Sequence, residues 1–89
     1  MQWVRVGQLP VLAARSDAAW RRALEQVSHV LEQVRLRDHD CAWCLELAGD
    51  RAREAGYEER AAYCYTASAA HWRAVGEGER AASVEARLG

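Results

Sequence analysis

The 89-residue sequence lacks Lys, Ile, Phe and Asn and contains a single Pro. All four missing amino acids have AT-rich codons, so their absence indicates a GC-rich source genome. All twelve basic residues are Arg. Because Arg is the only cation that this chain uses, its Arg content does not by itself indicate phosphate binding. Ala, Leu and Val supply 34 residues, and such a composition, rich in helix formers and poor in breakers, predicts a small helical domain.

Long apolar runs and an excess of one charge are also missing. The longest aliphatic run, residues 11–14, is too short to span a membrane, and the N-terminus lacks the pattern of a secretory signal. Twelve Arg and thirteen acidic residues are interspersed and give a net charge of −1, without the basic stripe of a nucleic-acid-binding protein. We therefore expect neither a membrane segment nor a nucleic-acid partner.

Cysteine is scarce, with three residues and no pattern of a disulfide framework. An odd number of cysteines without a secretory signal is typical of a reducing compartment. The sequence therefore predicts thiols and a cytoplasmic location.

Apolar residues recur at steps of three and four, which is typical of amphipathic helices. The predicted helices span residues 16–37, 40–55, 58–75 and 78–88. Short connections favour antiparallel packing of successive helices. We expect one all-α domain over residues 10–89, as a tetratricopeptide-like or four-helix array, preceded by an extended arm over residues 1–9.

Because Ala buries little area, large aromatic side chains are expected to supply much of the core. These residues are Trp20, Trp43, Tyr63, Tyr65 and Trp72.

A ten-residue segment is repeated after twenty residues. The residues from Arg53 to Ala62 match those from Arg73 to Ala82 at six positions, in the pattern Arg-x-x-Gly-x-x-Glu-Arg-Ala-Ala. The repeat predicts the same joint twice, in which one helix ends at Gly and the next begins. A helix–turn–helix unit is then forty residues long.

Residues 41–89 resemble a tetratricopeptide repeat of the long bacterial type. The small, glycine and aromatic positions of that family are matched by Gly49, Gly56, Ala61, Tyr65 and Ser68. The resemblance implies a non-catalytic scaffold that binds a protein or peptide on the concave face of its first helix. By position, that face carries Trp43, Glu46, Asp50 and Arg53. The alternative is that Trp43 is a core residue and the charges are simply solvated.

Repeat units of this kind rarely fold alone, and about three are usually needed for stability. The chain contains at most two, and Ala81, Val84 and Leu88 of its last helix have no following helix to cover them. We therefore expect a homo-oligomer, with the last helix or the arm covering a neighbour.

Two other functions remain open. Cys41 and Cys44 form a Cys-x-x-Cys motif at a helix start, so a metal-binding or thiol-redox protein could use them with Cys64 and His71. A homodimeric helical-bundle regulatory subunit is the other alternative. Since no phosphate loop, nucleophile elbow or zinc-protease motif occurs, we expect no enzyme activity and no cofactor.

Overall fold

A computed structural model describes residues 11, 14–32 and 39–88 of the chain, without the side chains of Leu24 and of residues 26–32. The described residues include four helices and no strand, which confirms the predicted all-α class. The helices are α3 (Asp17–Glu32), α4 (His39–Glu54), α5 (Glu58–Ala74) and α6 (Gly78–Glu85). No helix in the described part of the chain is long and apolar enough to cross a lipid bilayer.

The predicted bounds agree with α4 and α5 to within one residue at each end. The last predicted helix, over residues 78–88, is too long, because α6 ends at Glu85. There the N–H groups of Arg87 and Leu88 bond carbonyls only three residues back, in the tighter turn common at helix ends. The arm over residues 1–9 and the end of the first predicted helix lie outside the described residues.

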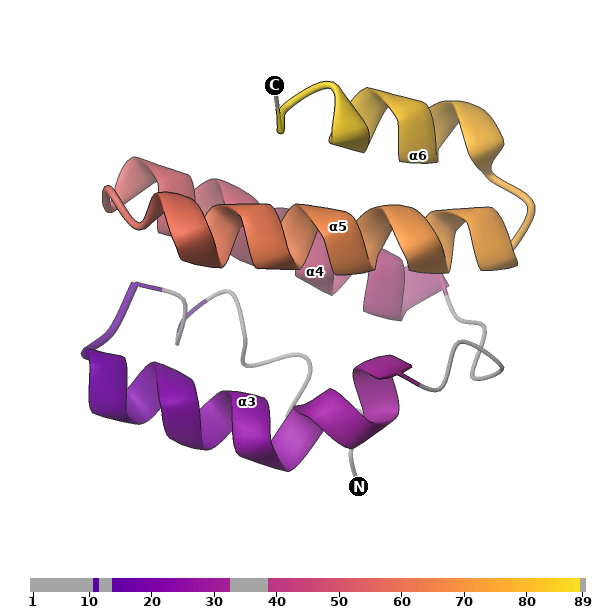
Figure 1. Cartoon of the computed structure of the whole chain (residues 1–89). Helices are drawn as coiled ribbons and strands as arrows, with labels where there is room; N and C mark the ends of the chain where they lie inside the picture. The colour runs from indigo at the N-terminus through magenta and orange to yellow at the C-terminus, as the bar shows by residue number, and fades with distance from the viewer. Residues whose placement is uncertain (1–10, 12–13, 33–38, 89) are drawn as a thin grey trace.

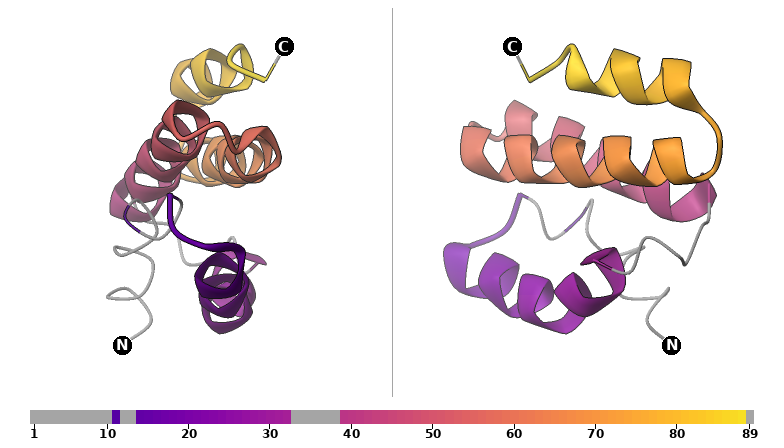
Figure 2. Two further views of the ribbon diagram at one scale, coloured as in Figure 1. Left: turned by 90° about the vertical axis from the view of Figure 1, so that its left-hand side faces the viewer. Right: turned by 45° about the vertical axis from the view of Figure 1, so that its right-hand side comes forward.

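Successive helices run in opposite directions (Figure 1). Helices α4 and α5 lie side by side in the middle of the molecule, with α6 on one side of this pair and α3 on the other (Figure 2). The antiparallel packing predicted from the short connections is therefore confirmed for α4, α5 and α6.

Small residues allow α4 and α5 to approach closely. Gly49 lies against the ring of Tyr65, and a Cβ atom added at Gly49 would be 2.6 Å from Cε1 of that ring. Nearby, Ser68 Oγ donates a hydrogen bond of 2.8 Å to the carbonyl of Ala42. Both contacts are buried, so α5 is packed directly onto the backbone of α4.

The two repeated segments form the same helix joint. Gly56 and Gly76 have φ angles of 89° and 85°, a left-handed conformation that favours glycine. The N–H of each glycine bonds the carbonyl three residues back, at 3.0 and 3.1 Å, and the next N–H bonds the carbonyl five residues back, at 2.8 Å in both joints. This is the Schellman pattern of helix ends, so the joint predicted from the repeat is confirmed.

The aromatic core is smaller than expected. Trp20, Tyr65 and Trp72 are buried, whereas Trp43 and Tyr63 are 50% and 39% exposed. Tyr63 was wrongly placed in the core, and of the two interpretations of Trp43 the surface one is correct, because Ala, Cys and Leu residues occupy the faces of α4 and α5 that meet.

The C-terminal helix also differs from expectation. Ala81 and Val84 are fully buried within the chain, and only Leu88 leaves part of its side chain exposed. Helix α5 provides the cover that was expected from another molecule, since α6 packs along it.

Candidate interaction surface around Trp43

The four residues predicted to bind a partner follow one side of α4 at steps of three and four. Trp43 and Arg53 are accessible, Asp50 is half-buried, and Glu46 is only 5% exposed. This side of α4 meets α6 and the turn that follows it. The four residues therefore share a region, but the two carboxylates are engaged inside the protein.

Glu46 accepts hydrogen bonds on both carboxylate oxygens. Arg80 donates from Nε to Oε1 and from Nη2 to Oε2, both at 3.1 Å, and Nη2 of Arg87 lies 3.2 Å from Oε2. The indole Nε1 of Trp72 donates to Oε1 at 3.2 Å. Burial raises the pKa of Glu46, but the hydrogen bonds and charges of the two arginines outweigh that effect, and the pKa lies below its ordinary value. Glu46 is an ionised and internally paired carboxylate.

Asp50 and Arg53 attach the turn after α6 to α4. Tyr65 Oη donates to Asp50 Oδ1 at 2.6 Å, and Arg87 Nη1 donates to the same oxygen at 3.2 Å. Arg53 Nη2 donates to the carbonyl of Arg87, and the two guanidinium groups lie 5.3 and 5.7 Å from the centre of the Tyr65 ring. Burial and the hydrogen bond to Asp50 raise the pKa of Tyr65 to about 12, so its hydroxyl stays a donor.

Trp43 lies at one end of a series of stacked groups. The guanidinium of Arg80 lies over Trp43 and over Trp72, 5.2 Å from each ring centre. His39 meets Trp72 edge-on, at 5.9 Å between ring centres, and its Nε2 is 3.9 Å from a carboxylate oxygen of Glu77. Trp72 is 7% exposed, whereas Trp43 and His39 are accessible, so Trp43 is the accessible indole of this series.

Sequence reasoning did not identify Arg80, Arg87 or Trp72 as parts of this surface. Arg80 carried an available signal, since it stands twenty residues after Arg60 in the repeated segment. Arg87 carried none, because its partners on α4 are 37 and 41 residues away in the chain. Such contacts depend on how the helices pack.

Arg60 makes the corresponding contacts between α5 and the start of α3. Its side chain is 7% exposed, and Nη1 donates to the carbonyl of Arg15 at 2.7 Å while Nη2 bonds the carboxylate of Asp17. The guanidinium lies 3.6 Å from the ring centre of Tyr57 and 5.7 Å from that of Trp20. Arg60 thus joins α5 to the start of α3, and Arg80 joins α6 to α4. In both cases the repeated arginine contacts the helix two before its own.

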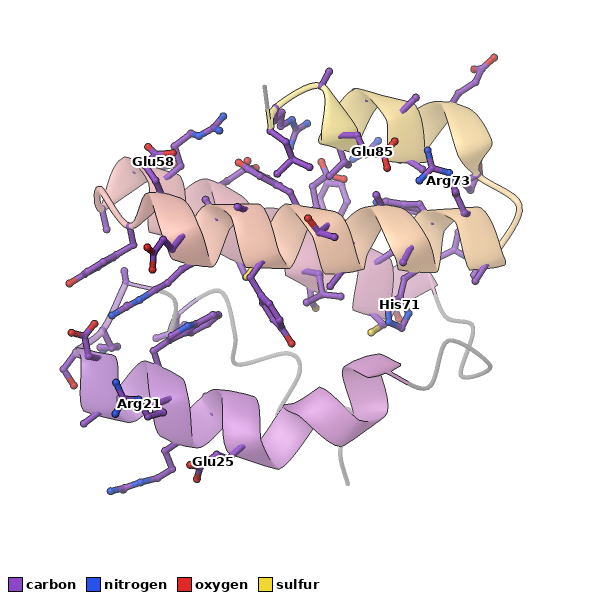
Figure 3. The ribbon with its side chains drawn as sticks, in the orientation of Figure 1. Arg21, Glu25, Glu58, His71, Arg73 and Glu85 are labelled. Atoms are coloured by element: carbon purple, nitrogen blue, oxygen red, sulfur yellow. The ribbon has the colours of Figure 1, made fainter. Side chains whose placement is uncertain are left out.

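The candidate metal and thiol residues are mostly inside the fold. Cys41, Cys64 and His71 are at most 1% exposed and Cys44 is half-buried, with His71 on the side of α5 away from α6 (Figure 3). Burial raises the pKa of Cys64 to about 12, so this thiol is protonated at neutral pH and is a poor nucleophile or metal ligand. Among the described residues, no group of three or more His, Cys, Asp or Glu is arranged to hold a metal ion. The arrangement favours a packing role.

Comparisons with protein-family models, with curated proteins and with solved structures find no match to this chain. We therefore define the candidate surface by the contacts that its residues make in this structure. We call Trp43, Arg80, Glu46 and Trp72 the Trp43 site, in which an exposed indole lies beside a paired arginine.

Proposed function

We propose that this chain is a non-catalytic interaction module that binds a protein or peptide partner through the exposed part of Trp43. The observation that carries the proposal is a large aromatic side chain, 50% exposed, with a guanidinium group over its ring. Trp and Arg are the residue types most enriched among the residues that dominate binding energy at protein interfaces. Trp is highly buried on average and is enriched at interfaces, so a half-exposed indole beside a paired arginine supports a binding role.

The contacts around Trp43 favour an apolar anchor on the partner. Glu46 is already bonded to Arg80 and Arg87, and Asp50 is bonded to Tyr65 and Arg87. A basic side chain of a partner would have to displace these arginines. We therefore expect the partner to bring an aliphatic or aromatic side chain to Trp43, with polar contacts at the rim.

The tetratricopeptide-like character of the chain is part of the same proposal. Two equal joints, the antiparallel order of α4, α5 and α6, and the contact between Gly49 and Tyr65 all support it. In a helical repeat of that type, α4 and α6 line the same binding face, and Trp43 and Arg80 come from these two helices.

We also propose that the chain self-associates in the cytoplasm. Val11 and Leu88 are large apolar side chains with 59% and 41% exposure, and we expect them to contribute contacts between copies. Buried cysteine side chains suit a reducing compartment. Light scattering at micromolar concentration tests the assembly, and a single monomeric mass would contradict it.

The binding proposal is tested by affinity capture from host extract with the wild-type chain and with Trp43→Ala. We expect Trp43→Ala to weaken capture of a specific partner at least about tenfold. Tyr63→Ala is the matched control, because it removes another exposed aromatic ring from a different helix. Capture that is unchanged by Trp43→Ala, or lost equally in both variants, would show that the Trp43 site is not the binding surface.

A further inference from the structure

We infer that Arg80 is a positioning residue that holds the exposed indole of Trp43 in its binding orientation. The inference rests on the proposed function, but its first measurement needs no partner. It comes from two contacts of one guanidinium group, one with the buried carboxylate of Glu46 and one with the ring of Trp43.

The guanidinium of Arg80 is held on the side that faces the protein. It donates two hydrogen bonds of 3.1 Å to the two oxygens of Glu46, a geometry that fixes the plane of the group. The carboxylate is held in turn by the indole N–H of Trp72, whose ring lies 5.2 Å from the guanidinium. Glu46 and Trp72 are both buried, so Arg80 is anchored to the rigid part of the fold.

The same guanidinium covers part of the Trp43 ring. Its carbon lies over the indole at 5.2 Å from the ring centre, within the range of a cation–π contact. Trp43 and Glu46 are three residues apart on α4, whereas Arg80 comes from α6. The indole is therefore restrained by its own helix and by a group from another helix, while half of its surface stays open.

This arrangement affects binding through preorganisation. A side chain that is already held in its bound orientation loses less conformational entropy when a partner arrives. A second cation would also meet a ring over which a cation already lies, which favours an apolar or aromatic anchor on the partner. Arg80 contributes to affinity in this way without having to touch the partner.

The chain offers a matched control for Arg80 in Arg73. Arg73 also makes two hydrogen bonds to one carboxylate, from Nη1 and Nη2 to Glu85 at 2.7 and 2.5 Å, and this pair joins α5 to α6 (Figure 3). Arg73→Met removes an arginine–carboxylate pair between helices in which the carboxylate is Glu85 and not Glu46. Arg80→Met removes the same group beside Trp43, and Arg80→Lys keeps the charge without the planar fork.

The experiment measures the indole N–H signals of ¹⁵N-labelled chain by NMR relaxation, with Trp43→Phe used to assign the Trp43 signal. We expect the order parameter of the Trp43 indole N–H to be close to that of a rigid backbone, about 0.85, in the wild type and to fall below about 0.6, the value of a flexible segment, in Arg80→Met. Arg80→Lys should give an intermediate value, and Arg73→Met should match the wild type. An equal Trp43 order parameter in Arg80→Met and Arg73→Met overturns the inference. If Arg80→Met does not fold, a wild-type value in Arg80→Lys overturns it as well.

A second measurement uses the partner captured through Trp43. We expect Arg80→Met to raise its Kd about three- to tenfold, and Arg73→Met to leave it unchanged. If Trp43→Ala does not affect capture, the proposed function fails, and the order parameter still decides whether Arg80 holds the ring. If Trp43→Ala abolishes capture but Arg80→Met leaves Kd unchanged, the role of Arg80 in binding is wrong and the proposed function stands.

Discussion

Arg60 and Arg80 stand at the same position after identical helix joints, yet the burial within their ion pairs is reversed. The Arg60 side chain is 7% exposed and its partner Asp17 is 84% exposed. The Arg80 side chain is 41% exposed and its partner Glu46 is 7% exposed. The protein must satisfy a buried cation in the first pair and a buried anion in the second. Similar local sequences therefore build the same turn, while the neighbouring helices decide which charge is buried.

The reversed burial predicts which substitution in each pair lowers the free energy of unfolding more. A buried charge left without partners is strongly unfavourable, whereas a charge near the surface is hydrated by water. Glu46 depends on Arg80, Arg87 and Trp72 for its hydrogen bonds. Arg60 has the carbonyl of Arg15 in addition to its carboxylate partner. The buried anion is thus the more sensitive point.

The largest effect is expected when both arginines around Glu46 are replaced. Arg80→Met with Arg87→Met leaves this buried carboxylate with the Trp72 hydrogen bond, and we expect a loss of about 3 kcal/mol in the free energy of unfolding. Urea denaturation at pH 7 measures it. Glu46→Gln is the control, because it removes the buried charge itself and should cost only about 1 kcal/mol. An equal or larger loss in Glu46→Gln would show that the buried anion is not the critical group.

A smaller loss is expected from Arg60→Met. The substitution removes the bonds that join α5 to the start of α3 and the stacking on Tyr57, at a cost of about 2 kcal/mol. Amide hydrogen exchange should accelerate in α3 more than in α4. Arg51→Met is the matched control, since its exposed pair with Glu54, at 3.7 Å, should contribute less than about 0.5 kcal/mol. Uniform acceleration in both helices would argue against a local attachment of α3.

The two joints themselves should respond equally. Gly56→Ala and Gly76→Ala each place a side chain in a left-handed conformation, with no steric contact within 4 Å, and each should cost about 1 kcal/mol. Thermal unfolding followed by circular dichroism measures both. Gly78→Ala is the control, because this glycine begins α6 without a positive φ and alanine there should be neutral or stabilising. A clear difference between the first two variants would mean that the joints are not equivalent.

The smallest expected effect is on the pH dependence of the unfolding free energy that Glu46, the partner of Arg80, contributes. The folded-state pKa of Glu46 lies below its ordinary value of 4.5, so the folded chain binds fewer protons there than the unfolded chain. Glu46 therefore stabilises the fold above that pH, and this stabilisation is lost as the pH falls through the folded-state pKa. Between about pH 5 and pH 3, Glu46→Gln should lose less unfolding free energy than the wild type. Urea titrations at both pH values test this, and parallel losses would contradict it.

The repeat and the apolar spacing were enough to predict the helices and the joints. Gly56 and Gly76 end helices because only a residue without a Cβ adopts the left-handed conformation easily, and that preference is local. The end of α6 was predicted three residues too late, since periodicity continues through Leu88 although the backbone leaves the helix at Glu85. Local patterns locate helices better than they locate frayed ends.

The candidate site was only partly predictable. The spacing from the repeat resemblance selected Trp43, Glu46, Asp50 and Arg53 on one side of α4. It could not indicate that Glu46 is buried or that Arg80 lies over Trp43, because both facts arise where α6 crosses α4. Packing decided between the two alternatives for Trp43, core or surface. Small residues fill the face of α4 that meets α5, and the indole lies outside it.

The sequence by itself determined the all-α class, the positions of the helices and the two equal turns, because helix periodicity and glycine conformation act over a few neighbouring residues. The tertiary structure decided which side chains meet across helices. Arg60 and Arg80 occupy matching positions in the repeated segment, but one becomes a buried cation and the other the surface partner of a buried anion. Burial and electrostatic pairing depend on residues that lie 34 to 45 positions away in the chain, and folding alone brings these together.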